Sequence, residues 1–207
     1  MKYPKINSLF RRDRKTKKII EGDYSCPEFD NIEKWLVTEK IDGMNIRIFY
    51  KKGSKPRFGG RTDNAQLPPK LLDYLQEHFT TERLDGVLGK SDEAILYGEG
   101  YGEKIQRGGY YSKEQRFVLF DILVESKCWL EWDSIEEIAE GLEIPHAPLI
   151  HNAFRKQDVI DMVKDGNPSY FAEEDHVFEG VVARAYPMML FRDGTPMKFK
   201  LKVKDFK

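Results

Sequence analysis

Apolar and polar residues follow regular spacings along most of this chain, and these spacings predict where its strands lie. Residues 44–51 alternate between two faces, as a half-buried strand does. Residues 116–124 (RFVLFDILV) are apolar at almost every position, which indicates a strand buried on both faces. The other predicted strands cover residues 94–101, 178–185, 188–192 and 197–204.

Helical spacing predicts three helices between these strands. The first begins near Pro68–Pro69, because proline suits the first helical turn, and its apolar positions are Leu71, Leu72, Leu75 and Phe79. The second begins at Ser134, which forms a capping-box pattern with Glu137. The third covers residues 156–165 and ends at Gly166. Together the elements indicate an α+β fold with antiparallel sheets flanked by helices.

Composition narrows the class of protein. The 207 residues fit one domain, and 40% hydrophobic content is typical of a globular chain. Two distant cysteines, Cys26 and Cys128, argue against a disulfide framework and a cysteine zinc site. Because no apolar run reaches the ~18–20 residues of a membrane span, and Met1 opens a charged stretch, we expect a cytoplasmic protein without a membrane partner.

Charge is balanced overall but not locally. The chain has 34 Lys+Arg against 35 Asp+Glu, which argues against a histone-like coat on DNA. The first 20 residues are nevertheless basic, with Lys2, Lys5, Arg11, Arg12, Arg14, Lys15, Lys17 and Lys18. This stretch, within a lead-in segment of residues 1–35, is either a solvated, partly mobile arm or a nucleic-acid contact strip.

A lysine precedes a turn-forming Asp-Gly pair in residues 39–45 (EKIDGMN), and a predicted strand follows. One interpretation is a hairpin turn with an exposed lysine, Lys40. The other is a lysine nucleophile, which must lose its proton before it attacks. Neighbouring cations, a metal ion or partial burial favour the neutral form of a lysine.

A second cluster of lysines lies near the end of the sequence. Residues 197–204 alternate, so one face of the predicted strand carries Lys198, Lys200, Lys202 and Lys204. Lysines on an edge strand prevent edge-to-edge aggregation, which is one explanation. The other is binding of an anion such as a polyphosphate, and the same cations would then favour a neutral Lys40 nearby.

Two glutamates stand beside glycines in predicted strands: Glu99 in residues 97–102 (YGEGYG) and Glu179 in residues 178–182 (FEGVV). Glycine lets a ligand approach closely, and such carboxylates can bind Mg²⁺ through water or a ribose hydroxyl. Alternatively, both are surface residues at strand ends. The glycine-rich residues 104–111 match neither a P-loop nor a GxGxxG pattern, so those nucleotide-binding folds are not supported.

Two further side chains have a structural and a functional interpretation. Phe120 precedes Asp121 in the apolar strand and is either a core residue or one wall of a purine slot. Arg61 follows Gly59-Gly60 and is either a hairpin arginine or a phosphate contact.

The order of these motifs resembles the covalent nucleotidyltransferase superfamily, which comprises ATP-dependent DNA and RNA ligases and mRNA capping enzymes. Its motifs I, III, IIIa, IV and V look like residues 40–43, 97–100, 117–122, 179–182 and 200–202. The resemblance spans about residues 36–206. It implies a single adenylyltransferase domain over residues 1–207 with an ATP-grasp-like ligase fold.

Details of these motifs resemble the RNA ligase 2 type of RNA ligase. Glu39 stands before the lysine, and Asn45 occupies the place where DNA ligases and capping enzymes usually carry arginine. Arg61-Thr62 is similar to the arginine motif of the same type. Asp42 departs from it, because that type often has histidine there.

The resemblance implies an ATP-dependent first step in which Lys40 attacks the α-phosphate, expels pyrophosphate and carries AMP. Lys200 and Lys202 would contact the α-phosphate and assist catalysis. The other implied nucleotide contacts are Glu39 through its backbone at the adenine edge, Phe120 by stacking, Glu99 at the ribose, and Asp42, Gly43 and Arg61. Glu179 and Glu99 would hold Mg²⁺ or Mn²⁺.

In the later steps AMP would pass to an RNA 5′-phosphate, and a 3′-OH would displace it; Asn45 and Arg61 match positions implicated there. The sequence ends directly after motif V, so no OB fold is expected, and a partner or a second copy would supply a C-terminal clamp. The alternatives are a minimal DNA ligase, a capping-type nucleotidyltransferase, and a nucleic-acid-binding module without catalysis.

Overall fold

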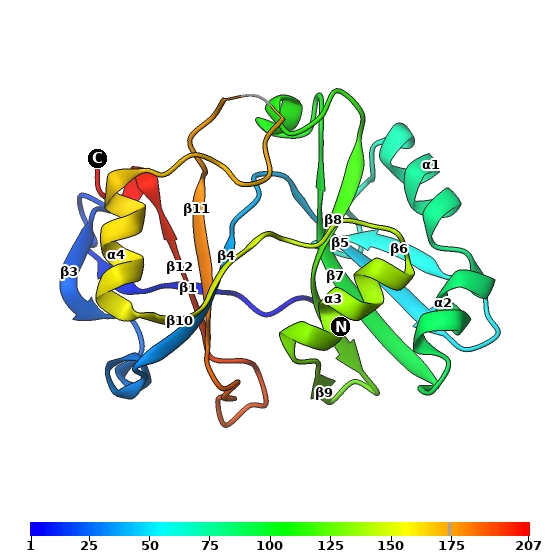
Figure 1. The fold of residues 1–207 in the computed structure, drawn as a ribbon, viewed down its shortest axis with the longest axis horizontal. Coiled ribbons are helices and arrows are strands. Elements are labelled where there is room, and N and C mark those ends of the chain that lie inside the picture. The colour runs from blue at the N-terminus through cyan, green and yellow to red at the C-terminus, as the bar shows by residue number, and fades with distance from the viewer. Residues whose placement is uncertain (174) are drawn as a thin grey trace. The chain divides into compact units, whose positions relative to one another are not determined.

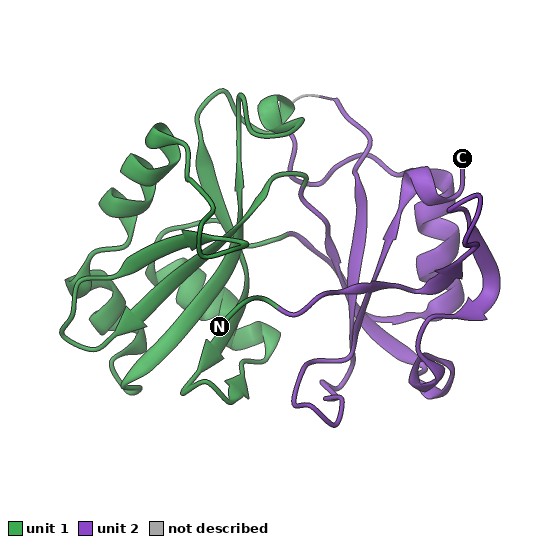
Figure 2. Cartoon of the chain, turned by 180° about the vertical axis from the view of Figure 1, so that it is seen from behind, with its two compact units in different colours: residues 1–3, 42–147 green, residues 4–41, 148–207 purple. Residues whose placement is uncertain are grey.

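The computed structural model describes residues 1–173 and 175–207 and divides into two compact units (Figures 1 and 2). Unit 1 comprises Met1–Tyr3 and Asp42–Ala147, and unit 2 comprises Pro4–Ile41 and Pro148–Lys207. Each unit contains a five-stranded sheet. The described residues form four α-helices, so the predicted α+β fold with antiparallel sheets is confirmed.

The sheet of unit 1 is antiparallel throughout, with strand order β6-β5-β7-β8-β9. Its strands are β5 (Met44–Lys51), β6 (Arg57–Gly60), β7 (Glu93–Tyr101), β8 (Arg116–Val124) and β9 (Cys128–Trp129). Three of them match the predicted strands to within one residue. β8 is buried along almost its whole length on both faces, as its apolar sequence predicted, and β7 and β9 pair with its two edges.

Unit 1 also holds α1 (Pro69–His78), α2 (Thr81–Leu88), α3 (Trp132–Gly141) and the 3-10 turn η2 (Gly108–Tyr110). α1 begins at the predicted proline and buries Leu71 and Leu75. The predicted start of α3 at Ser134 is wrong, because the helix begins two residues earlier. Starting there buries Trp132 together with Ile135, and the Trp132 indole donates to Glu136 Oε1 at 2.7 Å, one turn ahead.

The sheet of unit 2 has strand order β1-β12-β11-β4-β10. Its strands are β1 (Asn7–Ser8), β4 (Lys34–Glu39), β10 (Leu149–Arg155), β11 (Gly180–Ala185) and β12 (Lys198–Lys202). β12 pairs antiparallel with β11 and parallel with β1, so the lysine-rich strand lies inside the sheet. The edge-strand explanation of its lysines is therefore wrong.

One side of this sheet packs into a core with α4 (Lys156–Asp165). Trp35, Phe29 and Phe199 form edge-to-face aromatic pairs at its centre, with ring centroids 4.6–5.8 Å apart. The helix ends at Gly166 with φ of 71°, the left-handed conformation predicted for its C-cap. Short 3-10 turns η1 (Pro27–Asn31) and η3 (Val203–Asp205) complete the unit.

The N-terminal segment is not the solvated, partly mobile arm that was one of its two interpretations. Residues 7–24 supply β1 and the two-stranded sheet of β2 (Phe10–Arg12) and β3 (Ile19–Tyr24). Leu9 and Phe10 are 0% and 3% exposed and belong to the core of unit 2. Burial of these two apolar side chains anchors the segment, while the neighbouring lysines and arginines remain exposed.

The predicted strand over residues 188–192 is also wrong. These residues belong to an irregular connection between β11 and β12 that holds one isolated bridge, Leu190 with Pro196. Pro187 and Pro196 lack the N–H groups that a regular ladder needs, and an Asp193-Gly194 turn interrupts it. The neighbouring strand β11 begins at Gly180, two residues later than predicted.

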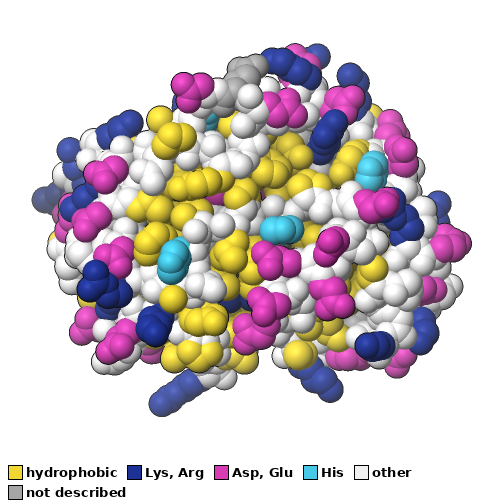
Figure 3. Space-filling view, viewed as in Figure 1, with side chains coloured by type: hydrophobic (Ala, Val, Ile, Leu, Met, Phe, Trp, Pro, Cys, Tyr) yellow, Lys and Arg dark blue, Asp and Glu magenta, His cyan; other side chains and the backbone are white. Residues whose placement is uncertain are grey.

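The surface view shows basic and acidic side chains interspersed across one face, in keeping with the net charge of −1 (Figure 3). Within residues 1–173 and 175–207, no helix combines the length and apolar character needed to cross a membrane.

Candidate active site

Lys40, the predicted nucleophile, follows directly after β4, and two backbone bonds hold the chain at this point. Glu39 N–H donates to Pro148 O at 2.9 Å, and Lys40 N–H donates to Gly180 O at 3.0 Å. Gly180 has φ of 151°, and a Cβ there would lie 2.1 Å from Leu201 O. Only glycine therefore lets β11 approach β12 closely enough to place Glu179 beside Lys40.

A shared carboxylate joins two of the predicted lysines. Lys40 Nζ donates to Glu179 Oε2 at 2.6 Å, and Lys202 Nζ donates to Glu179 Oε1. The three side chains are 21%, 15% and 21% exposed, so solvent reaches the cluster only in part. The structure thus brings together Lys40, Glu179 and Lys202, which are up to 162 positions apart in the sequence (202 − 40).

Opposing effects act on the Glu179 carboxyl. Burial by itself raises its pKa, but the charges of Lys40 and Lys202 and their hydrogen bonds outweigh burial and lower the pKa below its ordinary value. Glu179 is therefore ionised at neutral pH. With two ammonium groups around one carboxylate, the cluster keeps a net positive charge that suits a phosphate group.

The lysines of β12 share the face predicted for them. Phe199 and Leu201 are fully buried in the core of unit 2, and Lys200 and Lys202 lie on the opposite face. Lys198, on the same face, is only 7% exposed. Lys200 is partly buried and pairs in register with Val182, two residue pairs along the ladder from the pair of Lys202 and Gly180.

Glu39, predicted to read adenine through its backbone, uses its side chain within unit 2. It is 2% exposed, and its carboxylate accepts from Ser169 Oγ at 2.5 Å and from Tyr170 N–H at 2.7 Å. Burial raises the pKa of Glu39, against the effect of these bonds. The carboxylate therefore anchors the loop around residue 169 to the strand end before Lys40. Ser169 lies 130 positions away and carried no sequence signal.

In unit 1, Asp42 and Gly43 form a tightly packed turn. Asp42 N–H donates to the hydroxyl of the buried Tyr111 at 3.2 Å. A Cβ at Gly43 would lie 2.2 Å from Gly100 O and 2.9 Å from Glu99 Cγ. Gly43 thus allows the turn to pack against β7 beside Glu99. No local pattern indicated this role of Tyr111.

Asn45 and Glu99, both predicted site residues, are direct cross-strand partners in β5 and β7. Side chains of such a pair lie on the same face of the sheet, with Cβ atoms about 4.5–5.5 Å apart. Asn45 Oδ1 is buried and has no hydrogen-bond donor among the described residues. A buried acceptor of this kind is suited to a ligand that brings its own donor.

Phe120 occupies a β-bulge. Tyr97 pairs with Asp121 but Gly98 pairs with Leu119, so Phe120 is the extra residue in β8. The ring of Tyr3 packs edge-on against Phe120 at 5.1 Å between centroids, and Tyr3 donates its hydroxyl proton to Asp121 Oδ2 at 2.7 Å. Tyr3 therefore helps to fix the Phe120 ring, a role that no local pattern indicated.

Arg61 directly follows β6 and is exposed. Gly59 and Gly60, which precede it, belong to this strand, and Arg61 lies in the turn that follows. In unit 1 the predicted residues are Asp42, Gly43, Asn45, Arg61, Glu99 and Phe120, whereas unit 2 holds Glu39, Lys40, Glu179, Lys200 and Lys202.

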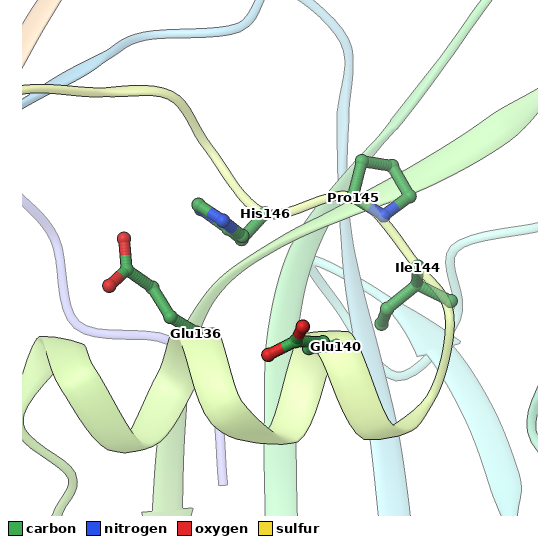
Figure 4. Close-up of a pocket in the computed structure, with 5 residues that line it drawn as sticks. All are labelled: Glu136, Glu140, Ile144, Pro145 and His146. Atoms are coloured by element: carbon green, nitrogen blue, oxygen red, sulfur yellow. The ribbon is translucent and has the colours of Figure 1, made fainter.

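An open pocket of about 550 Å³ lies beside α3 in unit 1 (Figure 4). Glu136 and Glu140 reach it from α3, and Ile144, Pro145 and His146 line it from the segment that follows. None of the predicted site residues lines this pocket. In the described part of the chain, no three His, Cys, Asp or Glu side chains are grouped so that they could hold a metal ion.

Several solved structures of Naegleria gruberi RNA ligase share this fold. A lysine-to-alanine variant of Naegleria gruberi RNA ligase with ATP and Mn has a TM-score of 0.66 and 19% identity, covering 98% of this chain and 64% of that chain. The same ligase with PPi has a TM-score of 0.63 and 20% identity, covering 97% and 61%. This chain therefore spans about three fifths of the length of those structures.

The family model of RNA ligases matches residues 33–204, so the chain belongs to the RNA ligase family. This match contains the Lys40 cluster and every predicted site residue. No curated protein matches the chain.

Proposed function

We propose that this chain catalyses ATP-dependent RNA ligation through a covalent AMP intermediate on Lys40. The observation that carries the proposal is the contact of Lys40 and Lys202 with the two oxygens of Glu179, within the region matched by the family model. A lysine held at a strand end in a cationic, partly buried cluster is suited to attack a phosphate.

In the first step, Lys40 Nζ attacks the α-phosphorus of ATP. A P–N bond forms, the P–O bond to pyrophosphate breaks, and pyrophosphate leaves with the electron pair. The ammonium must first lose a proton, and the charge of Lys202 beside it favours the neutral amine. Lys202, with Lys200 on the same face, stabilises the negative charge that develops on the phosphate.

The nucleotide contacts follow the family roles. Phe120 stacks on adenine, the backbone at Glu39 reads its edge, and Glu99 binds the ribose. The orphaned Asn45 Oδ1 opposite Glu99 supports a hydroxyl-bearing ligand at this place, because a ribose hydroxyl supplies the missing donor. Asp42 and Gly43 shape the turn beside Glu99, and Arg61 contacts phosphate.

A divalent cation fits the carboxylates only with outside ligands. Glu179 already accepts bonds on both oxygens, and the described residues hold no group of three potential metal ligands. Glu179 and Glu99 are the proposed carboxylate ligands for Mg²⁺ or Mn²⁺, each of which would act with phosphate oxygens and water. When bound, it would neutralise charge on the phosphates. Naegleria ligase structures with ATP or AMP contain Mn, which supports this choice.

In the later steps AMP passes from Lys40 to the 5′-phosphate of an RNA, and a 3′-OH then attacks that phosphate and releases AMP. Asn45 and Arg61 act at the RNA ends. The RNA preference is tested by sealing substrates whose 3′ strand ends in ribose or deoxyribose, because the 2′-OH distinguishes the two. Equal rates on all-DNA nicks would contradict it.

The first step is tested by incubating the protein with Mg²⁺ and α-labelled ATP or GTP, followed by a denaturing gel. Label from ATP that survives denaturation and is absent in Lys40→Ala supports the proposal. Label from GTP instead would indicate capping chemistry. Binding of RNA without any adduct, in folded protein freed of bound AMP, would indicate a binding module.

A further inference from the structure

Arg47 is a charged side chain buried in the sheet of unit 1, near the proposed RNA-end residues, and we propose that it is a positioning residue for Arg61. It lies in the middle of β5 and is 2% exposed. The inference is that Arg47 fixes the turn from Gly60 to Asp63 so that Arg61 faces a phosphate of the nucleic acid. It rests on the proposed function, in which Arg61 binds phosphate.

Two hydrogen bonds from Arg47 bracket Arg61 in the sequence. Arg47 Nε donates to Gly60 O at 2.7 Å, directly before Arg61, and Arg47 Nη2 donates to Asp63 Oδ1 at 2.9 Å, two residues after it. Arg61, Thr62 and Asp63 are themselves exposed. The ordering of this exposed turn therefore depends on a donor buried in the sheet beneath it.

The planar guanidinium explains why arginine serves here. Its donors point in fixed directions, so one side chain holds the backbone before Arg61 and the side chain after it at the same time. The remaining nitrogen, Nη1, donates to Met1 O at 3.4 Å, and the guanidinium lies 5.2 Å from the ring centroid of Phe49. These contacts satisfy the buried charge, and only the Gly60 and Asp63 bonds reach the turn.

Gly60, where this turn begins, lies beside Asn45 in the sheet. Gly60 pairs with Ile46 in the β5–β6 ladder, and a Cβ at Gly60 would lie 3.7 Å from Asn45 O. Asn45 and Arg47 share one face of β5, because they are two residues apart. Arg47 thus places Arg61 next to the other residue proposed for RNA end joining.

The test compares Arg47→Lys and Asp63→Asn with Arg61→Ala in two assays: AMP transfer to Lys40, and sealing of RNA that already carries a 5′-adenylate. Lysine keeps the charge but cannot make both bonds. We expect both variants to slow the same step as Arg61→Ala, by about 10- to 100-fold. Asp73→Asn, which removes an exposed carboxylate from α1, is the matched control and changes neither step.

Coupling distinguishes positioning from a structural role. Combining Asp63→Asn with Arg61→Ala is expected to be no worse than Arg61→Ala alone, because the turn then has no arginine to orient. Multiplicative losses, or an equal loss in both assays with a lower Tm, would overturn the inference. If Arg61→Ala changes neither step, the inference fails while AMP transfer to Lys40 leaves the proposed function standing.

A physical readout applies whether or not the chain is an active ligase. Amide hydrogen exchange of residues 61–64, followed by mass spectrometry, is expected to be faster in Arg47→Lys and Asp63→Asn than in Asp73→Asn. Unchanged exchange would contradict the inference. Absence of any adduct in the unaltered protein would instead contradict the proposed function.

Discussion

The ammonium of Lys40 lies 2.6 Å from Oε2 of Glu179, whose other oxygen accepts from Lys202. One carboxylate therefore holds together two cations that would otherwise repel each other. Under the proposed function, Lys40 must leave Glu179 before it attacks the α-phosphate, so Glu179 is expected to have both a structural and a chemical effect.

Replacing Glu179 by glutamine is expected to change both the rate of AMP transfer and the stability of the fold. The variant loses the charged carboxylate that holds Lys40 and Lys202 in place and that is the proposed metal ligand, so AMP transfer should fall by about 10²-fold or more. It also leaves two partly buried ammonium groups with a neutral partner, which should lower the free energy of unfolding by about 1–3 kcal/mol at neutral pH. Labelled-adduct rates and urea unfolding measure the two effects. An unchanged adduct rate would exclude Glu179 from the chemistry.

The lowered pKa of Glu179 predicts how its contribution to stability changes with pH. Because the folded-state pKa of Glu179 is depressed, its contribution to stability is present above its unfolded pKa and is lost as pH falls through the folded value. The stability difference between the unaltered protein and Glu179→Gln should therefore shrink below about pH 4.5.

The contribution of Glu39 to stability should change with pH in the opposite direction. Burial raises its folded-state pKa, so its contribution is greatest below the unfolded value and decreases as pH rises through the folded one. The stability difference between the unaltered protein and Glu39→Gln is expected to decrease with rising pH above about 4.5, measured by urea unfolding at each pH. Parallel slopes for the two variants would contradict the opposite environments assigned to them.

Local sequence patterns predicted the elements that proline, glycine and periodic apolar residues define by themselves. α4 ends at Gly166 and β5 covers residues 44–51 as predicted. The N-terminal strands were missed because the few apolar residues of this basic stretch, Leu9 and Phe10 among them, follow no regular spacing. The start of α3 was misplaced because burial of Trp132 outweighs a serine cap. Tertiary packing decided both cases.

In the candidate site, too, local patterns indicated some residues, and others depend on tertiary contacts. The order of short motifs indicated Lys40, Glu179 and Lys202, and the structure places their charged groups in contact. Ser169 and Tyr111 support these motifs from 130 and 69 positions away, and no local pattern indicates such partners. Residues that position a site through distant contacts become visible only in the folded chain.

Gly180→Ala should destabilise unit 2 for two separable reasons. Alanine is strained at φ of 151°, and its Cβ would lie 2.1 Å from Leu201 O. Gly194 has φ of 80° but no atom within 4 Å of a Cβ, so Gly194→Ala reports the backbone strain alone. In urea unfolding, we expect the free energy of unfolding to decrease by about 1 kcal/mol for Gly194→Ala and by at least about 3 kcal/mol for Gly180→Ala. Equal losses would show that the close approach of β11 and β12 is not limiting.

Phe120 provides a test of adenine binding. Phe120→Leu keeps an apolar side chain but removes the ring, so the KM for ATP should rise by about tenfold with little change in the maximal rate of AMP transfer. Phe120→Tyr retains the ring and should stay near the unaltered KM. The measurement is the initial rate of adduct formation across ATP concentrations. A lower maximal rate at unchanged KM would place Phe120 outside the nucleobase site.

The tip of the β2–β3 hairpin is an ordered turn that carries a cluster of basic side chains. Asp13 accepts bonds from Lys15 N–H, Thr16 N–H and the Thr16 hydroxyl at 2.6–3.0 Å, which gives the turn a defined structure. In the described chain, no carboxylate forms an ion pair with the basic side chains at this tip, which are Arg14, Lys15, Lys17 and Lys18. Such a cluster is suited to an RNA phosphate backbone.

Neutralising these four side chains to glutamine should weaken RNA binding and flatten its salt dependence, because each phosphate contact adds about 0.7–0.9 to the slope of log K against log salt. We expect the slope to decrease by at least about 1 between roughly 50 and 200 mM salt, with AMP transfer to Lys40 unchanged. The matched control neutralises four exposed lysines of unit 1: Lys55, Lys70, Lys90 and Lys127. An equal decrease in the control would mean that general charge, and not the hairpin, determines binding.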